Sequence, residues 1–231
     1  MYNKTGCLLI HGFGGDPSDV EPLADFLHQK GILVLCPTLK GHTGKRRDLR
    51  GVSYRQWIQS AEEGLKALSN QCDNLVLIGF SMGGLISVSL PHSNQVRGIV
   101  LLNTPIYPWN LKQIGLNIIT DLRKRSYEHI RYYTSSIKKI PISATIEFLK
   151  FLNTAKHNFK QQKYPLFIGQ ALADDTVQPR SAEYIYHSCP IADKSLYYYG
   201  TSNHLICHSK AAPELFKDIL MFIENCCVRN L

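Results

Sequence analysis

A serine between two glycines, in the segment Gly79-Phe80-Ser81-Met82-Gly83, is the residue of this chain best placed to do chemistry. The apolar run at 75–78 predicts a buried parallel strand before it, and residues 84–90 begin like a helix. Glycines at such a strand-to-helix turn leave room for a strained backbone that lifts the serine hydroxyl above the sheet. We therefore predict that Ser81 is a nucleophile. The alternative is an ordinary turn whose serine caps the helix.

A serine hydroxyl attacks poorly unless a histidine takes its proton and a carboxylate orients that histidine. The carboxylate is expected after a later strand, and residues 165–172 predict that strand, with an acidic loop at 173–179 behind it. The spacing Asp-x-x-Val-x-Pro favours Asp174 as the acid. Its neighbour Asp175 is the alternative acid. If Asp174 is the acid, Asp175 is expected to be a solvated turn residue or a helix cap.

The histidine is expected after the last strand, which the residues at 194–199 predict from their strand propensity. His204 stands at the end of the turn that follows, where a loop at the carboxyl edge of the sheet can reach Ser81. His208, one helical turn further on, is the competing candidate. No spacing of histidines and cysteines suggests a zinc site, so metal catalysis is not expected. Five other histidines are interpreted as surface residues: His28, His92, His129, His157 and His187.

Backbone N–H groups are also needed to bind the negative charge that develops on an attacked carbonyl oxygen. The loss of one such donor typically costs roughly 3 kcal/mol of transition-state stabilisation. We predict one donor at Met82, directly after the nucleophile. The second is predicted at Phe13, in the glycine-rich loop at 11–15 that follows a strand at 7–10. A phosphate-binding loop is the competing interpretation, but neither of its usual glycine motifs is present.

Taken together, the loop His11-Gly12-Phe13-Gly14-Gly15, the Ser81 turn, the Asp174 loop and His204 resemble the α/β-hydrolase superfamily, and within it small bacterial carboxylesterases and monoacylglycerol lipases. The resemblance implies hydrolysis of carboxylic esters through an acyl-enzyme, without a cofactor. It also implies the triad and the two oxyanion donors named above. The chain departs from the family pattern at Asn203, where glycine is common, and in the basic run at 45–47 after Gly41-His42.

The elements that must position these residues alternate between strand and helix, which predicts an α/β fold with helices on both faces of a mostly parallel sheet. The usual hydrolase sheet has two further strands before the oxyanion loop, so about six strands are expected here. Amphipathic helices are predicted at 20–30, 54–68 and 213–226. The expected strands begin near Cys7, Ile32, Asn74, Gly98, Pro165 and Lys194.

About sixty residues separate the strand near Gly98 from the strand near Pro165, which is too many for one crossover. We predict that residues 107–163 form an inserted helical cap on a single domain spanning 1–231, with helices at 111–125, 127–136 and 143–159. A cap over the serine would supply an apolar acyl pocket and exclude water. The alternative is that its apolar residues only attach the insert to the core.

The whole net charge of the chain, +8, falls within this insert. Residues 106–163 carry eleven Lys and Arg against three acidic residues, while the rest of the chain carries fifteen of each sign. One hypothesis is that the basic cap contacts anionic lipid surfaces or steers anionic substrates. The other is a solubilising face. Nucleic-acid binding is not expected, because no accompanying motif is present.

The remaining composition argues for a single reduced domain. No run of 18 apolar residues predicts a membrane span, and a core strand follows almost immediately after Met1, which leaves no room for a signal peptide. The seven cysteines include strand positions and the adjacent pair Cys226-Cys227, a poor geometry for a structural bridge. These features favour a reduced protein of the cytoplasm.

From these residues and this resemblance we expect a serine esterase that acts on small-molecule acyl esters, including monoacylglycerol. The same triad could serve an acyl thioesterase, an acyltransferase or a peptidase, because a fold does not fix a substrate. A ligand-binding receptor that keeps the hydrolase scaffold without catalysis is the alternative from another class. The presence of all three triad residues argues against it.

Overall fold

The computed structural model describes residues 4–91, 93–128, 131, 139–200 and 202–228, and a wholly parallel sheet of six strands lies at its centre. The strand order is β2-β1-β3-β4-β5-β6, so the chain crosses over β1 between its second and third strands. The predicted α/β-hydrolase sheet is thereby confirmed. Its strands are β1 (Thr5–Ile10), β2 (Leu33–Leu35), β3 (Asn74–Phe80), β4 (Val96–Leu102), β5 (Leu166–Ala171) and β6 (Lys194–Tyr199).

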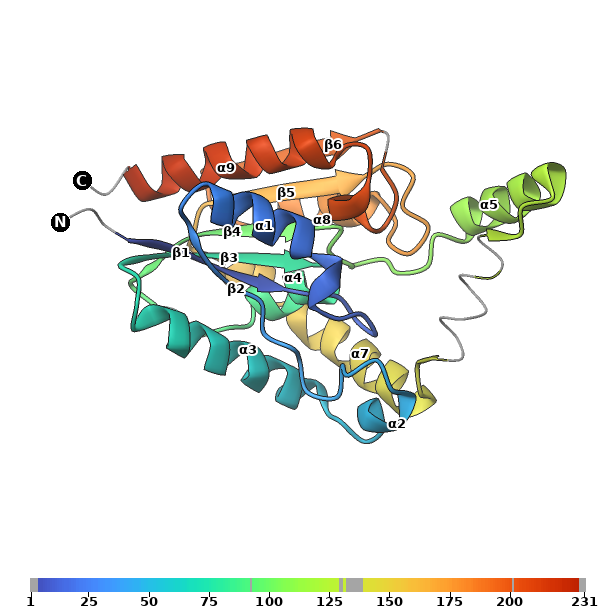
Figure 1. Ribbon diagram of the computed structural model, residues 1–231, viewed down its shortest axis with the longest axis horizontal. Helices are drawn as coiled ribbons and strands as arrows, with labels where there is room; N and C mark the ends of the chain where they lie inside the picture. Colours follow the sequence, from blue (N-terminus) through green and yellow to red (C-terminus); the bar gives the residue numbers. More distant parts are fainter. Residues whose placement is uncertain (1–3, 92, 129–130, 132–138, 201, 229–231) are drawn as a thin grey trace.

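Helices cover both faces of the sheet, so its central strands are apolar throughout. In β1, Leu8 and Ile10 join one core layer while Cys7 and Leu9 join the other, as the two-residue period of a strand requires. Helices α1 (Glu21–Gln29) and α9 (Ala212–Val228) pack on one face (Figure 1). The other face is covered by α3 (Tyr54–Ser69), α4 (Met82–Ser87), α7 (Ile142–Ala155) and α8 (Arg180–Ser188).

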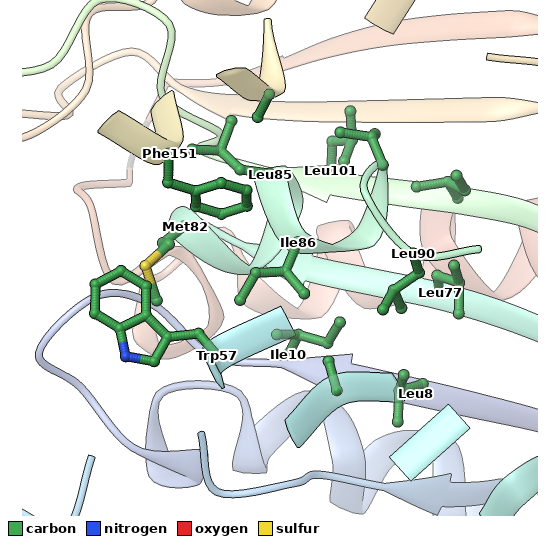
Figure 2. Close-up of a cluster of buried hydrophobic side chains, with 14 of the residues drawn as sticks. Leu8, Ile10, Trp57, Leu77, Met82, Leu85, Ile86, Leu90, Leu101 and Phe151 are labelled. Atoms are coloured by element: carbon green, nitrogen blue, oxygen red, sulfur yellow. The ribbon is translucent and has the colours of Figure 1, made fainter. Parts of the chain in front are cut away.

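The core layer that contains Leu8 and Ile10 reaches the carboxyl end of β3, where the Ser81 turn lies. Figure 2 shows Trp57 of α3 and Phe151 of α7 gathered around Met82, the first residue of α4. All three side chains are almost fully buried. This packing fixes the start of α4, and with it the backbone on either side of Ser81, because buried side chains interdigitate at crystal-like density.

Several predicted helix limits need correction. The helix predicted to open at 84 begins at Met82, and the one predicted at 143–159 is interrupted. Its last part is a separate 3-10 turn, η2 (Asn158–Gln161), because the residues after Ala155 include poor helix formers such as His157 and Asn158. The helix predicted at 127–136 lies mostly outside the described residues. Four short elements were not predicted: η1 (Pro17–Asp19), α2 (Arg46–Leu49), α8 and η3 (Ile206–His208).

Helix α5 (Leu111–Lys124) lies beyond the carboxyl ends of the strands, apart from the sheet and the helices that cover it (Figure 1). Helix α7, from the same long connection between β4 and β5, instead packs against α3 and α4. Within the described ranges, no helix is long and apolar enough to cross a membrane.

Candidate active site

Ser81 has a backbone conformation that residues other than glycine rarely adopt, with φ 52° and ψ −120°. Its N–H donates to the carbonyl of Leu102 on β4 at 2.8 Å, which ties the turn to the neighbouring strand. A Cβ on Gly79 would lie 2.3 Å from the carbonyl oxygen of Gly83, and a Cβ on Gly83 would lie 2.0 Å from the carbonyl oxygen of Ile10. Both glycines are therefore required by close backbone approach.

Asp174 and His204 meet at the same edge of the sheet, from the loops after β5 and β6. His204 Nδ1 lies 2.9 Å from Asp174 Oδ2, and the carboxylate is fully buried. The other carboxylate oxygen accepts the N–H groups of Thr176 and Val177, each at 2.8 Å. An ionised carboxylate only accepts, so the imidazole carries its proton on Nδ1 and leaves Nε2 free to take a proton.

The pKa of His204 is raised above its ordinary value of 6.5. Burial lowers it, but the charge and hydrogen bond of Asp174 outweigh burial, and the charges of Asp175 and Asp19 add to the increase. Asp19 is itself unusual, because burial and the nearby Asp16 raise the pKa of its carboxyl to about 6. The imidazolium that forms during a proton transfer is therefore stabilised by several carboxylates.

The two competing candidates occupy other positions. Asp175 Oδ2 accepts a hydrogen bond from Asn117 Nδ2 of α5 at 3.1 Å, and its Oδ1 accepts one from the Thr176 hydroxyl. His208 is exposed, and its Nε2 lies 2.9 Å from the carbonyl of Ser18. Neither residue forms the histidine–carboxylate pair.

The segment that carries Ser81 contacts His204 through the neighbouring residue. The ring of Phe80, adjacent to the serine in sequence, is 5.0 Å from the imidazole of His204, centroid to centroid. Among the hydrogen bonds of the described residues, none joins Ser81 to His204. Such contacts often tighten only when substrate binds.

The glycine-rich loop is held directly beside Ser81. A Cβ on Gly12 would lie 3.3 Å from the Cβ of Ser81. The Leu39 N–H donates to His11 Nε2 at 3.2 Å, so the proton of this ring is on Nδ1, which donates to the Gly12 carbonyl at 2.9 Å. His11 thus fixes the loop through a defined tautomer. Met82 is the first residue of α4, so its N–H has no acceptor inside the helix.

The side chain of Phe13 fastens the same loop to the helices below it. Its ring stacks on Phe148 of α7 with centroids 5.0 Å apart, and it contacts the rings of Trp57 and His42. Burial and the neighbouring His11 lower the pKa of His42 to about 4, so this ring is neutral at pH 7. Phe13 therefore packs the loop against α3 and α7.

One residue of the site was missed by the sequence analysis. Asn103, directly after β4, is fully buried with φ 47°. Its Nδ2 donates to the carbonyl of His204 at 2.8 Å, and its Oδ1 accepts the N–H of Ala171, the last residue of β5, at 2.8 Å. One side chain therefore joins the histidine loop to the strand that carries the acid. An asparagine after a strand gives no such signal in sequence.

In the part of the chain that the structure describes, no group of three or more His, Cys, Asp or Glu could hold a metal ion. The histidines at 28, 157 and 187 are exposed, whereas His92 and His129 lie outside the described residues.

The sheet order, the strained serine turn at the end of β3 and the acid and histidine loops after β5 and β6 define the class: this is an α/β-hydrolase fold. The family model described as "Hydrolase_4: Serine aminopeptidase, S33" matches residues 3–211, and the chain belongs to that family.

The chain is similar to a monoacylglycerol lipase and to a carboxylesterase. The chain is 26% identical to a thermostable monoacylglycerol lipase of Bacillus sp. (strain H-257), over 96% of this chain and 91% of the lipase. It is 25% identical to a carboxylesterase of Bacillus subtilis (strain 168), over 94% and 92% of the two chains. A structure from work on the metagenome-derived lipolytic enzymes LipS and LipT shares the fold, with a TM-score of 0.80, 20% identity and coverage of 96% and 94%.

Proposed function

We propose that this protein is a serine hydrolase of carboxylic esters, and that single-chain acyl esters such as monoacylglycerol are its substrates. The observation that carries the proposal is the strained turn of Ser81 at the edge of the sheet where the buried Asp174–His204 pair lies. Two Bacillus relatives named as a monoacylglycerol lipase and a carboxylesterase support the substrate class.

In the proposed reaction, the Ser81 hydroxyl attacks the ester carbonyl while its proton passes to His204 Nε2. The oxyanion is bound by the N–H groups of Phe13 and Met82. The tetrahedral intermediate collapses, and His204 returns the proton to the departing alcohol, which leaves an acyl ester on Ser81. Water attacks this ester with His204 as base, and the carboxylic acid and the free serine are released. Asp174 holds the histidine tautomer throughout.

The residues around the glycine-rich loop suit an ester substrate whose alcohol group is polar. A cavity of about 80 Å³ adjoins the outer side of the glycine-rich loop. Its lining includes glycine backbone, Asp16, Lys45 and Lys139 in place of a continuous apolar wall. We keep the prediction of a cap at 107–163 as part of this proposal; it is supported by α7, which places Phe148 against Phe13 of the proposed oxyanion loop.

The proposal is tested by Ser81→Ala, with Ser69→Ala as the matched control on α3. Hydrolysis of a short-chain p-nitrophenyl ester should fall by about a millionfold, because triad members act as a unit. A fluorophosphonate should label the wild-type protein at Ser81 only, as seen by peptide mass spectrometry. Full esterase activity in the Ser81→Ala variant would refute the mechanism. Failure of both labelling and hydrolysis in the wild type would favour a non-catalytic receptor.

The family description names an aminopeptidase, so peptide hydrolysis is the second function to test. Amino-acid p-nitroanilides and acyl thioesters should be compared with acyl esters of increasing chain length at matched enzyme concentration. We expect the esters to give the highest kcat/KM. A higher value for an amino-acid anilide would move the assignment to a peptidase on the same triad.

A further inference from the structure

The cavity beside the glycine-rich loop is formed by segments that are remote in sequence. Its lining residues come from 14–16, 41–49 and 139. A Cβ on Gly14 would lie 2.8 Å from Ile140 Cδ1, and a Cβ on Gly41 would lie 2.7 Å from the carbonyl oxygen of Asp48. Both glycines also have φ near +80°, which other residues rarely adopt. Close approach and backbone conformation thus fix the segments that line the cavity.

The lining of this cavity carries net positive charge. Of the described residues that line it, Lys45 and Lys139 are cations and Asp16 is the one carboxylate. His42 also lines the cavity, but its pKa of about 4 keeps the ring neutral at pH 7. Ser18 donates to Asp16 Oδ1 from its N–H at 2.9 Å and from its hydroxyl at 2.5 Å. The two ammonium groups therefore set the sign of the potential at the cavity.

The segment around α2 brings further cations next to this cavity. Lys45 directly precedes α2, and Figure 1 shows α2 beside the start of α7, which Lys139 precedes. Arg47 and Arg50 are exposed, and Asp48 lies 3.4 Å from Arg47 Nε. The basic run at 45–47, where the sequence departs from the family pattern, is therefore located at the cavity.

The size and position of the cavity suit one part of an ester substrate. A volume of about 80 Å³ is the room that about three water molecules take, so it admits a compact polar group and excludes an acyl chain. Gly14, which lines the cavity, directly follows the proposed oxyanion donor Phe13. The ring of Phe13 meets the apolar side chains of Phe148 and Trp57. The polar cavity is therefore suited to the alcohol portion, and lysines commonly bind phosphate there as point charges.

We propose that Lys45 and Lys139 bind an anionic group on the alcohol portion of the substrate, and that the preferred substrate is an acyl ester of a phosphorylated alcohol, such as a monoacylglycerol phosphate. This inference rests on the proposed function, because it names the alcohol that leaves when Ser81 is acylated. The phosphate group itself does not react. Water cleaves the acyl-enzyme as before, and the products are the carboxylic acid and glycerol phosphate.

The test compares two water-soluble substrates, hexanoylglycerol and hexanoylglycerol phosphate. In the wild type, kcat/KM should be about tenfold higher for the phosphate ester, mainly through a lower KM, because two exposed ion pairs contribute modestly to binding. High salt should reduce the ratio of the two kcat/KM values to about one, since exposed charges are screened. Equal kcat/KM values for the two esters at low salt would overturn the proposal.

Variants then locate the preference in the cavity. Lys45→Gln/Lys139→Gln should reduce the ratio to about one, whereas Lys45→Arg/Lys139→Arg keeps both charges and should retain most of it. Lys66→Gln/Lys217→Gln removes the same charge from exposed positions on α3 and α9 and should leave the ratio unchanged. Both substrates are measured on one preparation of each variant, so any loss of folded protein cancels in the ratio. An equal fall in the Lys66→Gln/Lys217→Gln control would assign the preference to net charge and refute the cavity.

Binding of the alcohol product is measured separately, with the Ser81→Ala protein, so that it does not depend on catalysis. Phosphorus NMR should show line broadening of glycerol phosphate that disappears when Lys45→Gln/Lys139→Gln is added. Inorganic phosphate should cause less broadening. Equal broadening of inorganic phosphate, together with an ester ratio of about one, would make the cavity a site for free phosphate and overturn the substrate assignment. Esterase activity that persists in Ser81→Ala bears only on the proposed function and leaves the binding result intact.

Discussion

Two adjacent carboxylates in the loop after β5 have separate tasks, and hydrogen bonds decide which does which. One carboxylate oxygen of Asp174 accepts hydrogen bonds from two backbone N–H groups of its own turn, and the other accepts one from His204 Nδ1. Asp175 accepts a hydrogen bond from Asn117 of α5. The first carboxylate thus contacts His204 and the second contacts α5.

Asp174→Asn should therefore lower kcat on a p-nitrophenyl ester by about ten-thousandfold, because an amide favours the wrong imidazole tautomer. Asp175→Asn is the matched control at the next position. It should lower kcat by less than about tenfold, since it weakens one hydrogen bond, to Asn117, worth about 1 kcal/mol. Similar losses from both variants would contradict the assignment of Asp174 as the acid.

At the scale of elements, Asn103 connects three segments that are remote in sequence. It follows β4, accepts from the end of β5 and donates to the loop that carries His204. Its left-handed backbone costs free energy, and asparagine is among the side chains that tolerate this conformation best. We infer that Asn103 is a positioning residue, because it fixes the distance between the acid strand and the base.

Asn103→Gly keeps the backbone conformation and removes only the side chain, so it isolates this role. The kcat/KM should fall about a hundredfold, because a shift of about 1 Å in a catalytic group costs that much. The low-pH limb of the rate profile should move to lower pH, since Asp174 would raise the pKa of His204 less. Asn225→Ala on α9 serves as the control. A wild-type pH profile in Asn103→Gly would reduce Asn103 to a structural residue.

At the scale of the whole molecule, folding buries an imidazole in its neutral form. His42 is packed among His11, Phe13 and Trp57, and its Nε2 has no hydrogen-bond partner in the described part of the chain. The pKa of His42 falls from 6.5 to about 4 on folding. Below pH 6.5 the unfolded chain therefore binds a proton that the folded chain does not bind until about pH 4.

The stability that this burial supplies is present above pH 6.5 and is lost as the pH falls toward 4. Between pH 7.5 and pH 5, the free energy of unfolding should decline by about 2 kcal/mol more in the wild type than in His42→Asn. Urea unfolding of both proteins at the two pH values measures the difference. Asp19 and His204 contribute with the opposite sign and His11 with the same sign, and the comparison removes the contributions that do not depend on His42. Parallel pH dependences would show that His42 does not titrate as described.

The local patterns of the sequence were sufficient for the sheet and for the main candidates of the site. The glycines around Ser81 could be interpreted because only they permit the close backbone approach of that turn. The central strands could be located because they are short apolar runs with their own turn residues, and the last strand from its tyrosines, which favour strands. Helix α2 escaped prediction, since a segment of four residues carries little periodic signal. Helix α8 was also missed, although it is as long as the predicted helix α1.

Residue types and spacing by themselves determined the parallel sheet, the strained serine turn and the choice of Asp174 and His204 over their neighbours as candidates. Tertiary structure alone decided that Asn103 joins β5 to the His204 loop, that Asp175 contacts α5, and that apolar side chains of α5 such as Leu111 face solvent. The physical reason is range. Turn strain and strand periodicity act between residues close in the chain, whereas these three contacts depend on which remote segments the sheet order brings together.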